Sequence, residues 1–198
     1  MFTLTALCTR KFGTKAMDFT MLAQQCAADV QVGTMRRIVQ VESSFNPNAI
    51  GVVGGRLEHQ PRNRDEAIAT AQWLERNDYN YSVGLAQVNK KNLAKYGLTL
   101  ESGFDACLNL KVGAQILKEC FVRARQARSG EQVALRDAFS CYYSGNFVAG
   151  YTDGYVLKVL GAGSVEPAGT TRASRHSTAE SEPRPVQQAP QTASALIF

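Results

Sequence analysis

Apolar residues recur at the spacing of an α-helix in most segments between residues 34 and 160. The clearest case is a helix that Thr34 can cap. One side of this helix is formed by residues at positions i, i+3, i+4 and i+7, which are Met35, Ile38, Val39 and Glu42. Further helices are predicted over residues 65–75, 83–96, 108–128, 131–143 and 154–160.

Alternation typical of a β-strand is confined to residues 50–57, whose glycines favour a short hairpin or a loop. The pattern therefore predicts a mainly α domain with at most a small β-hairpin.

The composition changes sharply near residue 161. Residues 162–198 contain four of the six prolines and no aromatic residue before Phe198, as is typical of a disordered tail. Residues 1–16 are predicted to be a poorly ordered leader, and Met17 is an alternative start. A chain of 198 residues fits one domain with appendages, and we place this domain at residues 17–161.

Composition and charge exclude several classes of protein. With 44% hydrophobic residues, 20% charged residues and a mean hydropathy of −0.21, the chain is neither collagenous nor disordered throughout. It has no apolar run near the ~18 residues that a membrane-spanning helix needs. A net charge of +5 favours an anionic partner, which the charge alone leaves open between nucleic acid, anionic lipid and acidic polysaccharide.

The five cysteines follow no metal-ligand pattern, and the chain has only two histidines, so we expect no metal site and no cofactor. Four of the cysteines lie within residues 17–161 and form either two disulfides in an oxidising compartment or buried thiols. The first fifteen residues are apolar before they are basic, which is the reverse of a secretory signal. An export route is therefore not evident.

Glu42 is the strongest catalytic candidate. It lies on the apolar side of its own helix, immediately before a turn that contains Pro47. Burial disfavours the charged form of a carboxyl group, and a carboxyl protonated near neutral pH can act as a general acid. The alternative is an ordinary glutamate that points into solvent at the end of a helix.

Two other segments carry polar groups suited to sugar. Residues 82–89 (SVGLAQVN) present a glycine where a ligand can approach the backbone, followed by amide side chains that can bind hydroxyl and acetamido groups. Residues 141–146 (CYYSGN) end a helix with two tyrosines and a Gly-Asn turn. By default, Gln87 would be a surface amide and Tyr142 a core residue.

In this order, the three segments resemble motifs of the lytic transglycosylases of the goose-type-lysozyme-like group. ESSFNPNA at 42–49 matches the first motif, and GLAQ at 84–87 matches the second. CYYSG at 141–145 corresponds to the third, Ala-Tyr-Asn-x-Gly, with Tyr143 in place of asparagine. The resemblance covers about residues 20–160 and is strongest to the small transglycosylases of type IV secretion and conjugation systems, which LAQQC at 22–26 and Gly-Tyr-Val at 154–156 also resemble.

The resemblance implies a lysozyme-like fold and cleavage of the MurNAc-β-1,4-GlcNAc bond of peptidoglycan without water. Glu42 would protonate the glycosidic oxygen and then accept the proton of the MurNAc C6 hydroxyl, leaving a 1,6-anhydroMurNAc end. Most glycoside hydrolases use two carboxylates, whereas this route needs only one. The expected partners are glycan strands and components of a type IV secretion system, and we expect no binding of nucleic acid and no membrane-spanning segment. The expected location is the periplasm or cell envelope.

The resemblance also suggests supporting roles. Ser43 and Gln87 would bind the sugar near the cleaved bond, and Tyr142 would orient Glu42 through its hydroxyl. The remaining substrate-binding candidates are Asn89, Tyr143 and Asn146.

Other interpretations stay open. A muramidase could hydrolyse the same bond with Asp78 or another acid positioning water, although Asp78 and Glu58 are both expected to be solvated loop acids. A non-catalytic peptidoglycan-binding or assembly module is a second alternative. For the cysteines, we favour Cys26 with Cys107 and Cys120 with Cys141, which leaves Cys8 outside the domain, but four cysteines permit three connectivities.

Overall fold

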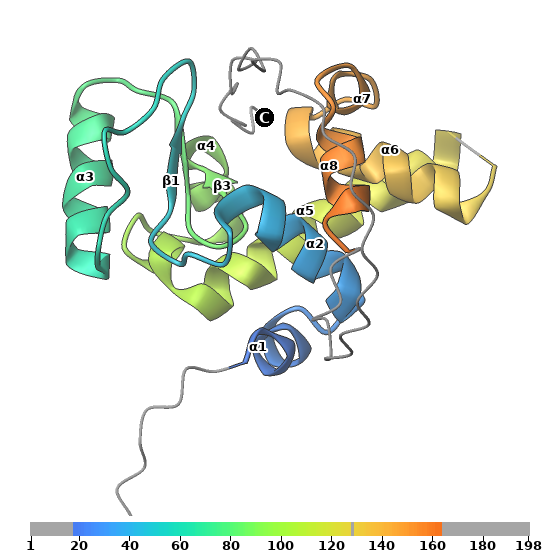
Figure 1. Ribbon diagram of the computed structural model, residues 1–198, viewed down its shortest axis with the longest axis horizontal. Helices are drawn as coiled ribbons and strands as arrows, with labels where there is room; N and C mark the ends of the chain where they lie inside the picture. Colours follow the sequence, from blue (N-terminus) through green and yellow to red (C-terminus); the bar gives the residue numbers. More distant parts are fainter. Residues whose placement is uncertain (1–17, 128, 164–198) are drawn as a thin grey trace, which may run out of the picture.

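We analysed a computed structural model of the chain, which describes residues 18–127 and 129–163 (Figure 1). The helices are α1 (Phe19–Cys26), α2 (Val32–Ser43), α3 (Arg64–Arg76), α4 (Lys90–Leu93), α5 (Ala106–Ala127), α6 (Glu131–Ser144), α7 (Ala149–Thr152) and α8 (Tyr155–Gly161). Short 3₁₀ turns cover Ala94–Tyr96 and Ser102–Phe104. The strands are β1 (Ile50–Val52), β2 (Tyr81–Val83) and β3 (Val88–Asn89). The prediction of a mainly α domain with a small β element is confirmed.

Helix α5 is the centre of the domain. It contacts α1, α6 and β3, and much of its length is buried. Figure 1 shows α2 passing between β1 on one side and α8 on the other. The C-terminal end of α2 therefore lies where the sheet and the last helices approach each other.

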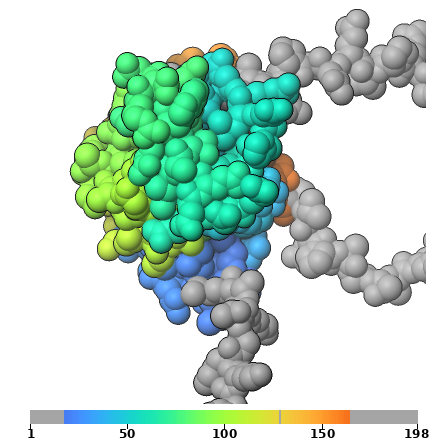
Figure 2. All heavy atoms as spheres, turned by 90° about the vertical axis from the view of Figure 1, so that its left-hand side faces the viewer, coloured from blue at the N-terminus to red at the C-terminus, as the bar shows by residue number. Residues whose placement is uncertain are grey.

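The sheet is antiparallel, with strand order β1-β2-β3. Ile50 pairs with Val83, and Val83 pairs in turn with Val88. The predicted strand at 50–57 is thus confirmed only over its first three residues, and its partner is not local but follows α3. On the other edge of β1, the side chain of Gln60 binds both the N–H and the carbonyl of Ile50, each at 2.9 Å. Figure 2 shows the face of the molecule that α3 and the neighbouring loops cover.

The predicted helix over residues 83–96 is wrong in its first half, whereas residues 90–96 are helical, as α4 and a 3₁₀ turn with Gly97 as its C-cap. The chain instead turns between β2 and β3, with Gly84 at φ +78° and Gln87 at φ +47°, and α4 begins only at Lys90. The buried side chain of Asn109 accepts a hydrogen bond from the N–H of Ala86 and donates to the carbonyl of Val83. Because a side chain on α5 supplies these hydrogen bonds, the segment does not need helical ones.

The other predicted helices are confirmed to within a few residues. Helix α2 begins at Val32, so Thr34 lies inside the helix and does not cap it. Helix α1 was not anticipated; Asp18 caps it by accepting a hydrogen bond from the N–H of Thr20.

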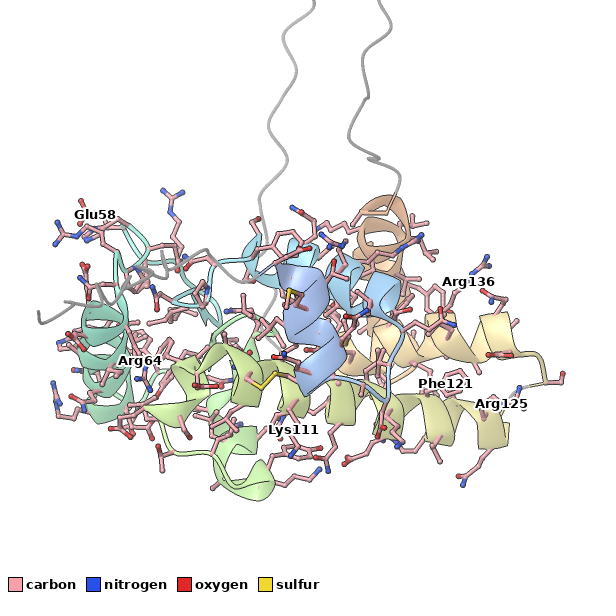
Figure 3. The ribbon with its side chains drawn as sticks, turned by 90° about the horizontal axis from the view of Figure 1, so that it is seen from below. Glu58, Arg64, Lys111, Phe121, Arg125 and Arg136 are labelled. Carbon is pink, nitrogen blue, oxygen red and sulfur yellow. A yellow bond between two sulfur atoms is a disulfide. The ribbon has the colours of Figure 1, made fainter. Side chains whose placement is uncertain are left out.

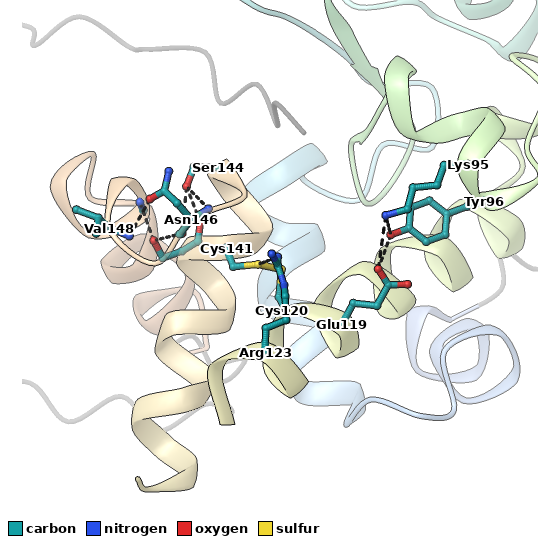
Figure 4. Close-up of a disulfide and its surroundings, with 11 residues drawn as sticks. Lys95, Tyr96, Glu119, Cys120, Arg123, Cys141, Ser144, Asn146 and Val148 are labelled. Atoms are coloured by element: carbon teal, nitrogen blue, oxygen red, sulfur yellow. Dashed lines mark hydrogen bonds and ion pairs between the residues drawn. A yellow bond between two sulfur atoms is a disulfide. The ribbon is translucent and has the colours of Figure 1, made fainter. Parts of the chain in front are cut away.

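Two disulfides connect the helices, and they have the pairing favoured above. Cys26–Cys107 joins α1 to α5 (Figure 3), and Cys120–Cys141 joins α5 to α6 (Figure 4). Cys8 lies outside the described residues.

The domain limits stay a prediction. The described helices begin at Phe19 and end at Gly161. The expected leader at 1–16, the alternative start at Met17 and the expected tail from residue 164 onward lie outside the described residues. Within the part of the chain that the structure describes, no helix has the length and apolar character needed to cross a membrane.

Candidate active site

Glu42 occupies the last turn of α2, and the chain leaves this helix by a sharp turn. Ser44 and Phe45 follow with φ of +50° and +64°, a conformation that is uncommon for residues other than glycine. The ring of Phe45 packs edge-on against Phe19 of α1, with ring centroids 5.1 Å apart. Strained backbone persists where surrounding contacts hold it, and such positions concentrate at functional sites.

The carboxyl group of Glu42 is shielded although the residue as a whole is partly exposed. Oε1 accepts a hydrogen bond of 2.5 Å from the hydroxyl of Tyr155, at the start of α8. Oε2 is buried and has no hydrogen-bond partner among the described residues. Burial raises the pKa of Glu42 to about 8, and the hydrogen bond from Tyr155 opposes this rise. At neutral pH the carboxyl is therefore largely protonated, as a general acid requires.

Two hydrogen bonds bring the three predicted segments together. The hydroxyl of Ser43 donates to the carbonyl of Leu85 at 2.8 Å, which joins the end of α2 to the loop between β2 and β3. The hydroxyl of Tyr142 on α6 donates to the carbonyl of Ala86 at 2.6 Å. The loop at 84–87 is thus held between the first and third segments.

Gln87 is held in one orientation. Its Nε2 donates to the carbonyls of Ala49 and Gly84, at 3.1 and 2.9 Å. Because both partners are acceptors, the nitrogen has to face them, which leaves Oε1 without a partner among the described residues. This oxygen can accept a hydrogen bond from a hydroxyl or amide group.

The hydrogen bond to Glu42 that we expected from Tyr142 comes from Tyr155. Tyr142 is fully buried and gives its single proton to Ala86, whereas Tyr155 binds the carboxyl of Glu42. Sequence reasoning missed Tyr155 because nothing local connects it to α2. The available signal is Gly-Tyr-Val at 154–156, a segment that resembles the type IV secretion transglycosylases.

Tyr143 packs against the ring of Tyr155. The two rings are stacked, with centroids 4.8 Å apart, and the hydroxyl of Tyr143 donates to Asp153 at 3.1 Å. Tyr143 is half-buried, and its expected contact with substrate stays a prediction.

Asn89 and Asn146 have structural roles. Asn89 is fully buried, its Nδ2 donates to Asn80, and its Oδ1 caps α4 at the N–H of Lys91. Asn89 has no exposed surface in this structure, and its expected contact with substrate stays a prediction. Oδ1 of Asn146 accepts from the N–H groups of Val148 and Ala149 at the start of α7 (Figure 4). Asn146 is exposed, and binding of substrate by the rest of its amide stays a prediction.

Among the described residues, Tyr155 is the one side chain that hydrogen-bonds the carboxyl of Glu42. The groups that shift its pKa include no other carboxylate. Asp78 and Glu58 are exposed, and Glu58 points outward at the α3 side of the molecule (Figure 3). Within residues 18–127 and 129–163, no cluster of three or more His, Cys, Asp or Glu residues could hold a metal ion.

A groove of about 1,100 Å³ runs along α5 between α1 and α4, but Glu42 is not among its lining residues. Its lining includes Lys95, Lys111 and Glu119. The pKa and hydrogen bonding of Glu42, rather than the size of this groove, therefore locate the candidate active site.

Comparison with known proteins agrees with this geometry. Residues 19–152 match the family described as "Transglycosylase SLT domain". The chain is 56% identical over 155 residues to "Type IV secretion system protein virB1" of Brucella abortus biovar 1 (strain 9-941), a match that covers 75% of this chain and 65% of that protein. This chain therefore spans a little under two thirds of that relative's length.

More distant relatives have similar names. "Protein virB1" of Rhizobium radiobacter is 35% identical over 172 residues, covering 83% of this chain and 70% of that protein. "Protein virB1" of Agrobacterium fabrum (strain C58 / ATCC 33970) is 36% identical over 146 residues, covering 72% of this chain and 58% of that protein. No solved structure matches the chain significantly. The family match contains Glu42, the loop at 84–87 and Tyr142, and the chain belongs to the transglycosylase SLT domain family.

Proposed function

We propose that the protein is a peptidoglycan lytic transglycosylase that uses Glu42 as both acid and base. The observation that carries the proposal is the carboxyl of Glu42, with its pKa raised to about 8, one oxygen bound by Tyr155 and the other buried and unpaired. Groups with strongly perturbed pKa values concentrate at functional sites.

In the first step, the proton of Glu42 passes to the glycosidic oxygen between MurNAc and GlcNAc. The bond from this oxygen to C1 of MurNAc breaks, and the GlcNAc hydroxyl leaves. Since Oε1 accepts from Tyr155, the transferable proton belongs on Oε2. The acetamido group of MurNAc stabilises the oxocarbenium-like carbon.

In the second step, the carboxylate of Glu42 takes the proton of the MurNAc C6 hydroxyl, and the oxygen of this hydroxyl bonds to C1. This closes the 1,6-anhydro ring and restores the protonated acid, so neither water nor a second carboxylate is consumed. The hydrogen bond from Tyr155 favours the carboxylate that exists between the two steps. Oε1 of Gln87 is oriented to accept a hydrogen bond from the sugar, and Ser43 supports the loop that carries Gln87.

A muramidase would place a second carboxylate about 5–9.5 Å from the first. Asp78 and Glu58 are both exposed, and neither affects the pKa of Glu42. Of the three motif segments, at residues 42–49, 84–87 and 141–145, only the first contains an acid, Glu42, and this favours the route without water.

We further propose that the enzyme opens the cell wall locally for a type IV secretion or conjugation apparatus, in the periplasm or cell envelope. Two observations support this. The Brucella relative is named as a type IV secretion system protein, and the chain has two disulfides, which persist in oxidising compartments.

The test is digestion of purified sacculi by the wild type and by Glu42→Gln, with product masses measured. We expect the wild type to release fragments with 1,6-anhydroMurNAc ends, and Glu42→Gln to release none while keeping its circular dichroism spectrum. Products one water heavier would instead identify a hydrolase. Release by Glu42→Gln at the wild-type rate would remove Glu42 from the mechanism.

A further inference from the structure

Trp73 and Tyr79 form an exposed aromatic pair at the end of α3. Their rings are stacked, with centroids 5.7 Å apart and planes 23° from parallel. Trp73 is 50% exposed and Tyr79 44% exposed. The pair is therefore a preformed aromatic surface and not a part of the core.

The backbone holds this pair in place. At the end of α3, the N–H of Tyr79 donates to the carbonyl of Leu74 and the N–H of Asp78 donates to that of Glu75, which is the Schellman pattern. Asp78 occupies the left-handed position of this turn, at φ +57°, where glycine is usual. The turn places Tyr79 against Trp73 and so fixes the aromatic surface before any ligand arrives.

Polar groups surround the rings. Arg76 lies one turn beyond Trp73 on the same side of α3, is exposed, and has no ion-pair partner among the described residues. Asn77 uses its Nδ2 to bind the carbonyl of Trp73, and its side chain is exposed. A pyranose ring has apolar C–H faces and a rim of hydroxyl groups, and peptidoglycan also carries carboxylates that complement Arg76.

Strand β2 connects the aromatic pair to the loop at 84–87 of the candidate active site. Tyr79 lies two residues before β2, and the loop at 84–87 directly follows this strand. Five residues of nearly extended chain span about 16 Å. A glycan strand is a linear polymer that extends beyond the bond being cut, so a second contact at this distance would hold it across the sheet.

We propose that Trp73 and Tyr79 form a carbohydrate-binding surface that stacks against a sugar ring of the glycan strand, away from the cleaved bond. This inference rests on the proposed function for its ligand, but it assigns binding to residues outside the three motifs.

The test uses Trp73 itself, because it is the single tryptophan of the sequence. The full chain carrying Glu42→Gln is titrated with peptide-free glycan strands, while tryptophan emission and its quenching by acrylamide are measured. We expect the strands to protect Trp73 from acrylamide at least about twofold. Tyr79→Ala should bind the strands about 3- to 10-fold more weakly, in line with the contribution of one aromatic contact.

Three variants control for folding and for position. Tyr79→Phe keeps the ring and should bind within about twofold of its parent, whereas Tyr79→Leu keeps an apolar contact without the ring and should behave like Tyr79→Ala. Val133→Ala removes an exposed apolar side chain on α6 and should leave binding unchanged. In the otherwise wild-type enzyme, Tyr79→Leu should slow release from sacculi by raising KM and leave kcat unchanged.

Unchanged quenching of Trp73 while Glu42→Gln still sediments with sacculi would overturn the inference. The inference would also be overturned if Tyr79→Ala lowered the unfolding temperature but left the affinity for glycan strands equal to that of the Glu42→Gln parent. The aromatic pair would then contribute to stability alone. Failure of the proposed function has a different signature, because the wild type would then release no anhydro product whatever Trp73 reports.

Discussion

The hydroxyl of Tyr155 donates a hydrogen bond of 2.5 Å to Oε1 of Glu42 across 113 positions of sequence. Burial of the carboxyl raises its pKa, and this hydrogen bond lowers it. A group that first gives a proton and then takes one back needs both forms to be accessible near the working pH. The contact between α8 and α2 therefore sets the balance between the two roles of Glu42.

Replacing Tyr155 with phenylalanine removes the donor that favours the carboxylate. We expect the pKa of Glu42 to rise further, so the alkaline limb of kcat/KM for release from sacculi moves above its wild-type position near pH 8. The rate should also fall by about 10²- to 10³-fold, the usual effect of losing one oriented donor. Tyr96→Phe, which removes a phenol that binds Glu119 instead, is the control. A slower enzyme whose alkaline limb has not moved would contradict this role of Tyr155.

The stability of the wild type should fall as pH rises from about 5 to 8. The carboxyl of Glu42 has a pKa of about 8 in the folded chain and an ordinary value near 4.5 when unfolded, so in this interval the folded state holds a proton that the unfolded state has released. At about 1.36 kcal/mol for each pKa unit, the loss is at most about 5 kcal/mol. Glu42→Gln should lack this loss, so urea unfolding at pH 5, 6.5 and 8 should show the variant gaining stability relative to the wild type. Parallel pH curves would indicate that Glu42 is not protonated in the fold.

Gly113 on α5 is required for the close approach of the loop at 84–87. A Cβ at this position would lie 2.4 Å from the Cβ of Ala86 and 3.1 Å from the hydroxyl of Tyr142. We expect Gly113→Ala to destabilise the fold by about 1–3 kcal/mol, as overpacking does, and to reduce activity because the loop carries Gln87. Gly33→Ala is the matched control, since a Cβ there meets nothing within 4 Å and should stabilise α2 by up to about 1 kcal/mol. Thermal unfolding and sacculus digestion measure both effects, and an active, stable Gly113→Ala would refute the close approach.

The two disulfides should differ in their contribution to stability. Cys26–Cys107 closes a separation of 81 residues, and Cys120–Cys141 closes one of 21. Loop-closure entropy predicts a loss of about 4–5 kcal/mol for the first and about 3 kcal/mol for the second. Paired Cys→Ser variants unfolded in urea test this order. Thiol titration of the denatured chain should find one free thiol without reductant and five with it, and three or more without reductant would exclude the pairing.

Helical periodicity was sufficient for most helices but not for the carboxyl of Glu42. The position of Glu42 on the apolar side of α2, just before a turn, left a buried and a solvent-exposed carboxyl both open, and the structure shows a buried carboxyl that Tyr155 of α8 contacts. The same reasoning located α3, α5, α6 and α8 to within a few residues. It failed over residues 83–89, where Asn109 binds the backbone N–H of Ala86 and the carbonyl of Val83 in place of helical hydrogen bonds.

The sequence by itself determined the fold class, the three motifs and the acid at the end of α2. Only the tertiary structure decided that Tyr155 rather than Tyr142 binds Glu42, that Asn89 is buried in β3, and that the amide oxygen of Gln87 has no partner among the described residues. The physical reason is that periodicity reports which side of an element is buried, whereas the partner of a buried polar group depends on which distant segment packs against it.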